Sequence, residues 1–174
     1  MITASTTSAA ETKKLAAAVA GLVRGGDILL LAGELGAGKT CFTQGFGAAL
    51  GVDEQITSPT FTLLRPYAGD TLQLLHADVY RLEHLQEIVD LGITEQVDGD
   101  AVAVIEWGDM AEPVLPADFL EIRLEYGGGG TTDDDDEDGA SDDARRLVLR
   151  PVGPAWAHRA EALTRALAPW AVAG

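Results

Sequence analysis

Apolar residues recur along the chain with two different periods, and glycines mark many of the changes between them. Residues 8–24 carry apolar side chains at helical spacing and end at Gly25–Gly26, which predicts an amphipathic helix. Segment 27–32 is Asp27 followed by a short continuous apolar run, and residues 101–105 form a second run. Both are typical of buried strands. A second helical stretch runs from about residue 38 to 50. The first half of the chain therefore indicates helices that alternate with buried strands.

The second half adds strands and two further helices. We expect paired strands over 61–67 and 71–80, a short helix over 83–91, strands over 119–126 and 146–150, and a final helix that starts near Pro154 and stops at Pro169. This alternation predicts an α/β fold of three layers. The 174 residues fit one domain over 1–174. Residues 127–144 are glycine-rich and acidic, so we expect a disordered loop there.

Charge and composition exclude several classes of protein. The chain has 28 acidic and 12 basic side chains, a formal net charge of −16. Eight of the acids lie in residues 131–143, and without them the charge is −8. Tight direct binding of nucleic acid needs clustered Lys and Arg, which this chain lacks. With one cysteine, no secretory signal and no apolar run of membrane-spanning length, we expect a cytoplasmic protein with no membrane association.

The segment GELGAGKT, residues 33–40, fits the phosphate-binding pattern G-x-x-x-x-G-K-[ST] in full, between an expected strand and an expected helix. Its glycines allow backbone amides to point at a phosphate, and the helix adds the positive end of its dipole. Lys39 is expected to reach the β- and γ-phosphates, and the Thr40 hydroxyl to ligate Mg²⁺. The backbone contacts to the nucleotide are expected from Gly36, Ala37, Gly38, Lys39, Thr40 and Cys41.

Such a loop also needs an acid for the metal ion or for the attacking water, at the end of a neighbouring strand. Glu106 follows the apolar run 101–105, and Asp78 follows His76 by two residues on an expected strand. Both acids are candidates for catalysis. We expect His76 itself to be a hydrogen-bonded core residue.

Two further features leave alternatives open. The hydroxyls of residues 57–60 either sense the γ-phosphate or belong to a Ser/Thr-rich turn. The thiol of Cys41 is either activated by the helix N-terminus or simply packed, and we favour packing.

Residue content narrows the kind of P-loop protein. The chain contains no asparagine, so it cannot carry the guanine-reading motif N-K-x-D. A small-molecule kinase needs a lid with several arginines, and between Thr40 and Glu121 the only Lys or Arg residues are Arg65 and Arg81. A compact ATPase that serves a partner is the favoured hypothesis. A kinase that acts on a small metabolite remains the alternative.

Five blocks occur in an order that resembles one bacterial family. They are GELGAGKT, SPTFTL from Ser58, HADVYRL from His76, DLGI from Asp90 and the pair Glu106–Trp107. In these blocks the sequence closely resembles the TsaE family, the ATPases required for biosynthesis of threonylcarbamoyladenosine in tRNA. The match covers roughly residues 1–126 and resumes at 145–150.

The resemblance implies a P-loop fold with a mixed, mainly parallel sheet flanked by helices. It implies that Mg-ATP is bound and hydrolysed on a TsaD–TsaB pair, which modifies adenosine-37 of ANN-decoding tRNA and makes the contact with tRNA. By position, Lys39 and Thr40 hold the phosphates and Mg²⁺, Glu106 serves the metal and the water, and Asp78 is a second essential acid. The same resemblance places Trp107, Ser8 and Arg146 near the nucleotide.

Overall fold

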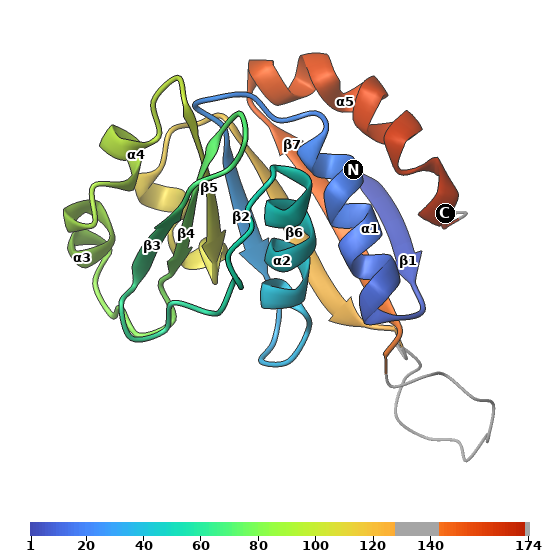
Figure 1. Ribbon diagram of the computed structural model, residues 1–174, viewed down its shortest axis with the longest axis horizontal. Coiled ribbons are helices and arrows are strands. Elements are labelled where there is room, and N and C mark those ends of the chain that lie inside the picture. The colour runs from blue at the N-terminus through green and yellow to red at the C-terminus, as the bar shows by residue number, and fades with distance from the viewer. Residues whose placement is uncertain (128–142, 173–174) are drawn as a thin grey trace.

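The computed structural model describes residues 1–127 and 143–172. Within these residues seven strands form one sheet in the order β1–β7–β6–β2–β5–β4–β3 (Figure 1). The strands are β1 (Ile2–Thr6), β2 (Ile28–Ala32), β3 (Leu64–Tyr67), β4 (Gln73–Asp78), β5 (Ala101–Glu106), β6 (Phe119–Tyr126) and β7 (Arg145–Val152). Strands β4, β5, β2 and β6 run parallel to one another, whereas β3, β7 and β1 are antiparallel to their neighbours.

Helices lie on both faces of this sheet. They are α1 (Ala9–Ala20), α2 (Lys39–Ala49), α3 (Leu85–Asp90), α4 (Ile93–Gln96) and α5 (Pro154–Ala166), with 3₁₀ turns η1 (Gly108–Met110), η2 (Glu112–Val114) and η3 (Ala168–Trp170). One core joins a face of the sheet to α1, α2 and α5, and a second core joins the other face to α3, α4 and η1 (Figure 1). The three-layer α/β prediction is confirmed.

The apolar runs form the centre of the sheet, as their composition demands. All residues of β2 and of β5 are buried, because helices or 3₁₀ turns cover both faces of these strands. Parallel strands that are joined by crossover helices bring their carboxyl ends to one edge of the sheet. The residues that follow β2 and the last residues of β4 and β5 therefore meet at that edge.

Some expected elements differ from the structure. Residues 2–6, which are mostly polar, form β1 because they pair with the edge of β7. Residues 61–63 precede β3 in a turn, and Leu63 adopts a left-handed φ of 65°. Strand β4 ends at Asp78, so the expected extension to Tyr80 is wrong. Helix α5 ends at Ala166, three residues before the expected stop.

The acidic segment lies mostly outside the described residues. Its described ends meet, because the Gly127 amide donates to the Ala144 carbonyl at 2.9 Å and closes the β6–β7 pair. The expectation of a disordered loop over 127–144 concerns residues 128–142, which the structure does not describe. In the described ranges no helix has the length and apolar character needed to cross a membrane.

Candidate nucleotide site

The phosphate-binding segment forms a loop that joins β2 to α2. Gly33 has a φ of 137°, and a Cβ at this position would overlap the carbonyl of Leu124 on the neighbouring strand. Gly38, which precedes α2, has a φ of 104°, a region that side chains rarely adopt. The first amides of a helix have no partner within the helix, so the start of α2 presents donors and a positive dipole to an anion. The loop thus combines left-handed glycines with a helix N-terminus, two features that anion-binding loops use.

Lys39 is buried at the centre of the loop. Its Nζ donates to the carbonyls of Gly33 at 2.7 Å and Glu34 at 2.8 Å, and it lies 3.9 Å from the ring centre of Trp107. Burial lowers the pKa of Lys39 below its ordinary value, while the nearby carboxylates, Glu106 foremost, act against this decrease. A phosphate group would supply a stronger counter-charge than the two carbonyls. To bind such a phosphate, the Lys39 amine would have to exchange its hydrogen bonds to the two carbonyls for hydrogen bonds to phosphate oxygens.

Glu106 is the acid that contacts the loop. It ends β5 and is almost fully buried, and its Oε1 accepts a hydrogen bond of 2.9 Å from the Thr40 hydroxyl. The same oxygen lies 2.8 Å from Nε2 of His76. Glu106 and Thr40 thus place two oxygen ligands side by side at the start of α2. The expectation that His76 is a hydrogen-bonded core residue is confirmed.

Asp78 lies beside Glu106 but has different partners. The two residues pair in register at the ends of β4 and β5. Oδ2 of Asp78 accepts from the hydroxyls of Ser58 at 2.9 Å and Thr60 at 3.2 Å. Its Oδ1 accepts from the Tyr80 amide at 2.9 Å. Asp78 therefore holds the loop that follows α2 and the turn that follows β4.

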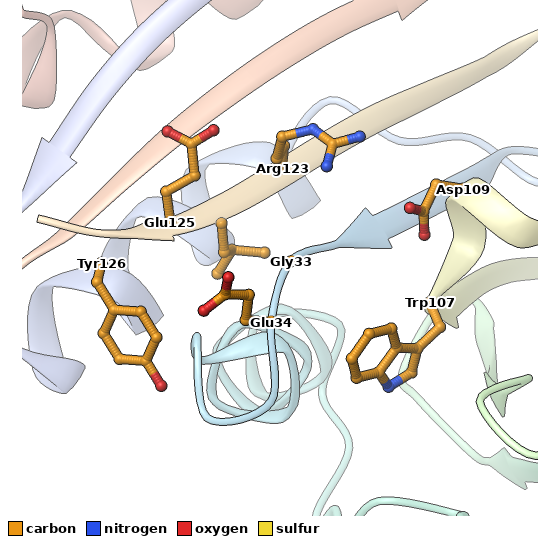
Figure 2. A pocket seen from close by; sticks show the side chains of 8 residues that line it. Gly33, Glu34, Trp107, Asp109, Arg123, Glu125 and Tyr126 are labelled. Atoms are coloured by element: carbon orange, nitrogen blue, oxygen red, sulfur yellow. The ribbon is translucent and has the colours of Figure 1, made fainter. Parts of the chain in front are cut away.

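These groups line one cavity of about 360 Å³. Its walls are Leu35, Gly36, Gly38, Lys39, Thr40, Cys41, Ser58, Thr60, Asp78, Tyr80, Glu106 and Trp107. A second cavity, of about 560 Å³, borders the same loop. Figure 2 shows Gly33 and Glu34 between Trp107 and Asp109 on one side and Arg123, Glu125 and Tyr126 on the other. Trp107 lines both cavities, with a left-handed φ of 60°.

Ser8 and Cys41 lie where α1 meets the start of α2. The Ser8 hydroxyl caps α1 by accepting from the Glu11 amide at 3.2 Å. The Cys41 thiol lies 3.5 Å from the carbonyl oxygen of Ala9. Burial raises the pKa of Cys41, which favours a packed thiol over an activated thiolate. The neighbour of Ser8, Ala9, thus meets the first turn of α2, while the Ser8 hydroxyl itself caps α1.

The structure does not bring Arg146 to the loop. Its guanidinium donates to Glu125 at 2.9 Å. The preceding residue, Arg145, instead donates to the carbonyls of Ala37 at 3.1 Å and Gly36 at 3.4 Å. Strand parity was the signal that could have found Arg145, because it shares a face of β7 with the buried residues that pack against the helices. Arg145 is therefore the arginine of β7 that lies against the loop.

The ligands present suit magnesium only together with a nucleotide. Thr40 and Glu106 offer oxygen ligands, which Mg²⁺ prefers. In the residues that the structure describes, no three His, Cys, Asp or Glu side chains form a metal-binding group. At this site Thr40 and Glu106 supply two oxygen atoms, and phosphate oxygens and water would have to complete the octahedron. The site fits a metal ion that arrives with the phosphates.

Comparisons with known proteins give evidence that is independent of this geometry. The family model described as "Threonylcarbamoyl adenosine biosynthesis protein TsaE" matches residues 6–132. Curated proteins named "tRNA threonylcarbamoyladenosine biosynthesis protein TsaE" are 43% identical over 118 residues in Bacillus subtilis (68% of this chain, 73% of that protein) and 46% identical over 117 residues in Treponema pallidum (67% and 86%).

A solved structure extends the similarity to nearly the whole fold. The crystal structure of Bacillus subtilis YdiB superposes with a TM-score of 0.72 and 32% identity, over 95% of this chain and 97% of that one. The family match covers well over half of the chain and includes the phosphate-binding loop and both strand-end carboxylates. The chain belongs to the TsaE family.

Proposed function

We propose that the protein is an ATPase that binds and hydrolyses Mg-ATP for the TsaD–TsaB complex, which makes threonylcarbamoyladenosine at position 37 of ANN-decoding tRNAs. The observation that carries the proposal is the grouping of Lys39, Thr40 and Glu106 at a loop whose backbone suits phosphate. Family membership supports the same pathway, because the relatives are named for it.

In this proposal each side chain of the site has a separate role. Lys39 leaves the carbonyls of the loop and binds the β- and γ-phosphates. Thr40 and Glu106 would hold Mg²⁺, which would supply charge neutralisation on the phosphates. Glu106 also orients the water whose oxygen bonds to the γ-phosphorus as the bond to the bridging oxygen breaks, giving ADP and inorganic phosphate. Asp78 keeps the Ser58–Thr60 loop against the cavity.

The rim of the cavity supports docking of a partner protein. Leu35 is 79% exposed, Phe61 84% and Tyr80 54%, and two of these three residues line the cavity itself. The guanidinium of Arg81 lies 4.3 Å from the ring centre of Phe61. Exposed apolar side chains that gather at one site are typical of an interaction surface. A partner that buries them would also exclude water from the nucleotide.

The charges of the cavity give a second reason to expect a partner. Among its described lining residues, Lys39 is the only cation. Phosphoryl transfer is accelerated by about 10³–10⁵ when an arginine contacts the transition state, and a partner often supplies that residue. We therefore expect slow hydrolysis by the isolated protein. The net charge of −16 also predicts weak direct binding of tRNA.

The decisive experiment measures steady-state ATPase activity of the protein alone, with TsaD–TsaB, and with tRNA alone. Stimulation by TsaD–TsaB is expected, and none by tRNA without the partners. A parallel assay follows tRNA modification by the reconstituted complex with and without this chain. Fast turnover by the isolated protein, or phosphoryl transfer to a metabolite, would contradict the proposal, and the second result would indicate a kinase.

A further inference from the structure

His76 lies beneath the nucleotide site and is fully buried within β4. One of its ring nitrogens, Nε2, is 2.8 Å from Oε1 of Glu106. The other, Nδ1, is buried and has no hydrogen-bond partner among the described residues. Most buried polar atoms in proteins have a hydrogen-bond partner, so a buried histidine whose single hydrogen bond goes to a carboxylate needs an explanation.

The two nitrogens indicate which one carries the proton. Oε1 of Glu106 already accepts from the Thr40 hydroxyl, and a carboxylate oxygen offers lone pairs only, so Nε2 must donate to it. A hydrogen on Nδ1 would be a buried donor without an acceptor, and orphaned N–H groups are rarer in protein interiors than under-satisfied acceptors. Both ends of the ring therefore favour the tautomer with the proton on Nε2.

The bond from His76 fixes one half of the Glu106 carboxylate. Oε1 receives two donors, one from the strand beside it and one from the start of α2. Oε2 forms no hydrogen bond with the described residues, although Glu106 lines the cavity. Two donors on one oxygen hold the carboxylate in a single orientation, which leaves the second oxygen available to a ligand of the cavity.

We infer that His76 is a positioning residue: its Nε2–H holds Oε1 of Glu106, so that Oε2 is presented to the magnesium ion or to the attacking water. The inference deepens the proposed ATPase function and rests on it for the catalytic consequence. The hydrogen bond itself is a property of the protein without ligands. Residues that orient a metal ligand in this way typically change metal affinity or activity by about 10–100-fold when they are replaced.

The hydrogen bond is tested first, on the protein without nucleotide or metal. Nitrogen-15 NMR distinguishes the two tautomers of a histidine, and the full chain contains three histidines. His84 and His158 are exposed, so replacing each with Gln removes their signals without touching the site. We expect a slowly exchanging proton on Nε2 of His76 and none on Nδ1. A proton on Nδ1, or rapid exchange with solvent, would overturn the inference.

The consequence for catalysis is tested with two replacements that differ in one property. The amide of Gln in His76→Gln can still donate to Glu106, whereas Leu in His76→Leu cannot. With TsaD–TsaB present, kcat should fall about 10–100-fold for His76→Leu and less for His76→Gln. ATP affinity without Mg²⁺ should stay unchanged in both. His158→Gln is the matched control, with wild-type kcat expected.

A double-mutant cycle separates positioning from a merely structural role. If His76 acts through Glu106, replacing His76 in a Glu106→Gln background should cost little further activity. Equal losses in both backgrounds, or equal kcat for His76→Gln and His76→Leu, would contradict the inference. If His76→Leu does not fold, His76→Gln and the tautomer measurement still decide. Absence of ATP turnover in the wild-type complex would defeat the proposed function but leave the tautomer result standing.

Discussion

Two neighbouring strands each end in a carboxylate, and the two carboxylates have different hydrogen-bond partners. Asp78 and Glu106 end β4 and β5, pair in register and are both buried. Asp78 accepts hydrogen bonds from the Ser58–Thr60 loop, whereas Glu106 accepts from Thr40 at the start of α2 and contacts His76. Both acids occupy equivalent positions in the sheet, so position alone does not distinguish their roles. We infer that the element each carboxylate contacts sets its role, and the following experiments test that inference.

Removing the cation that faces both carboxylates should have the largest effect. Lys39→Ala deletes charge-assisted bonds worth about 1.5–3 kcal/mol each, so ATP affinity should fall at least about tenfold. ATP turnover should be lost together with ATP affinity, so a further replacement of Asp78 or Glu106 should have no additional effect on turnover. Isothermal titration calorimetry measures the affinity, with Lys14→Ala, an exposed residue of α1 that lines neither cavity at the loop, as the control. Unchanged affinity would contradict the phosphate-binding assignment of the loop.

Replacing the acid of β5 should separate binding from turnover. Glu106→Gln is nearly isosteric but is a weaker metal ligand and lacks the carboxylate charge, so kcat should fall by about 100-fold or more. ATP affinity measured without Mg²⁺ should change little. Single-turnover assays with TsaD–TsaB make the comparison. Wild-type turnover in this variant would transfer the catalytic role to Asp78.

Replacing the acid of β4 should give a smaller and different loss. Asp78→Asn keeps one acceptor but weakens the bonds that hold Ser58 and Thr60, so the loop should be less ordered. We expect about tenfold slower turnover and a free energy of unfolding lower by about 1 kcal/mol. Thermal unfolding measures the second effect. A loss of turnover as large as that of Glu106→Gln, with unchanged stability, would refute a bracing role.

The smallest expected effect is on the reactivity of Cys41, which contacts neither Asp78 nor Glu106. Burial raises the pKa of Cys41, so less thiolate is present at neutral pH than in a free cysteine. Alkylation by iodoacetamide should therefore be slow at pH 7 and should rise with pH beyond the ordinary thiol range. ATP should slow it further, equally in wild type and in Glu106→Gln. Because Cys41 is the only cysteine of the chain, mass spectrometry gives the rate directly.

Much of this site was predictable from sequence because it depends on local spacing. The phosphate-binding pattern fixes a strand, a loop and a helix, so Lys39 and Thr40 could be placed in advance. The apolar run before Glu106 likewise predicted a buried strand with an acid at its carboxyl end. In both cases the information lies within a few consecutive residues.

The remaining features depend on pairing across the fold, which local sequence does not encode. β1 is mostly polar and is a strand only because β7 offers it an edge. Arg145 and Arg146 are the same residue type, and only the register of β7 decides which one faces the loop. The partners of Asp78 come from a segment about twenty positions earlier. Tertiary contacts decided each of these cases.

The contact between Lys39 and Trp107 makes the fluorescence of Trp107 sensitive to the position of the lysine. The Lys39 amine lies 3.9 Å from the centre of the indole ring, and the centres of the Tyr80 and Trp107 rings are 4.6 Å apart. A cation that leaves the face of an indole alters the field on its excited state. The other two tryptophans, Trp156 in the core and Trp170 in η3, lie outside both cavities at the loop. Intrinsic emission therefore offers a label-free test of whether the lysine changes partners when a nucleotide is added.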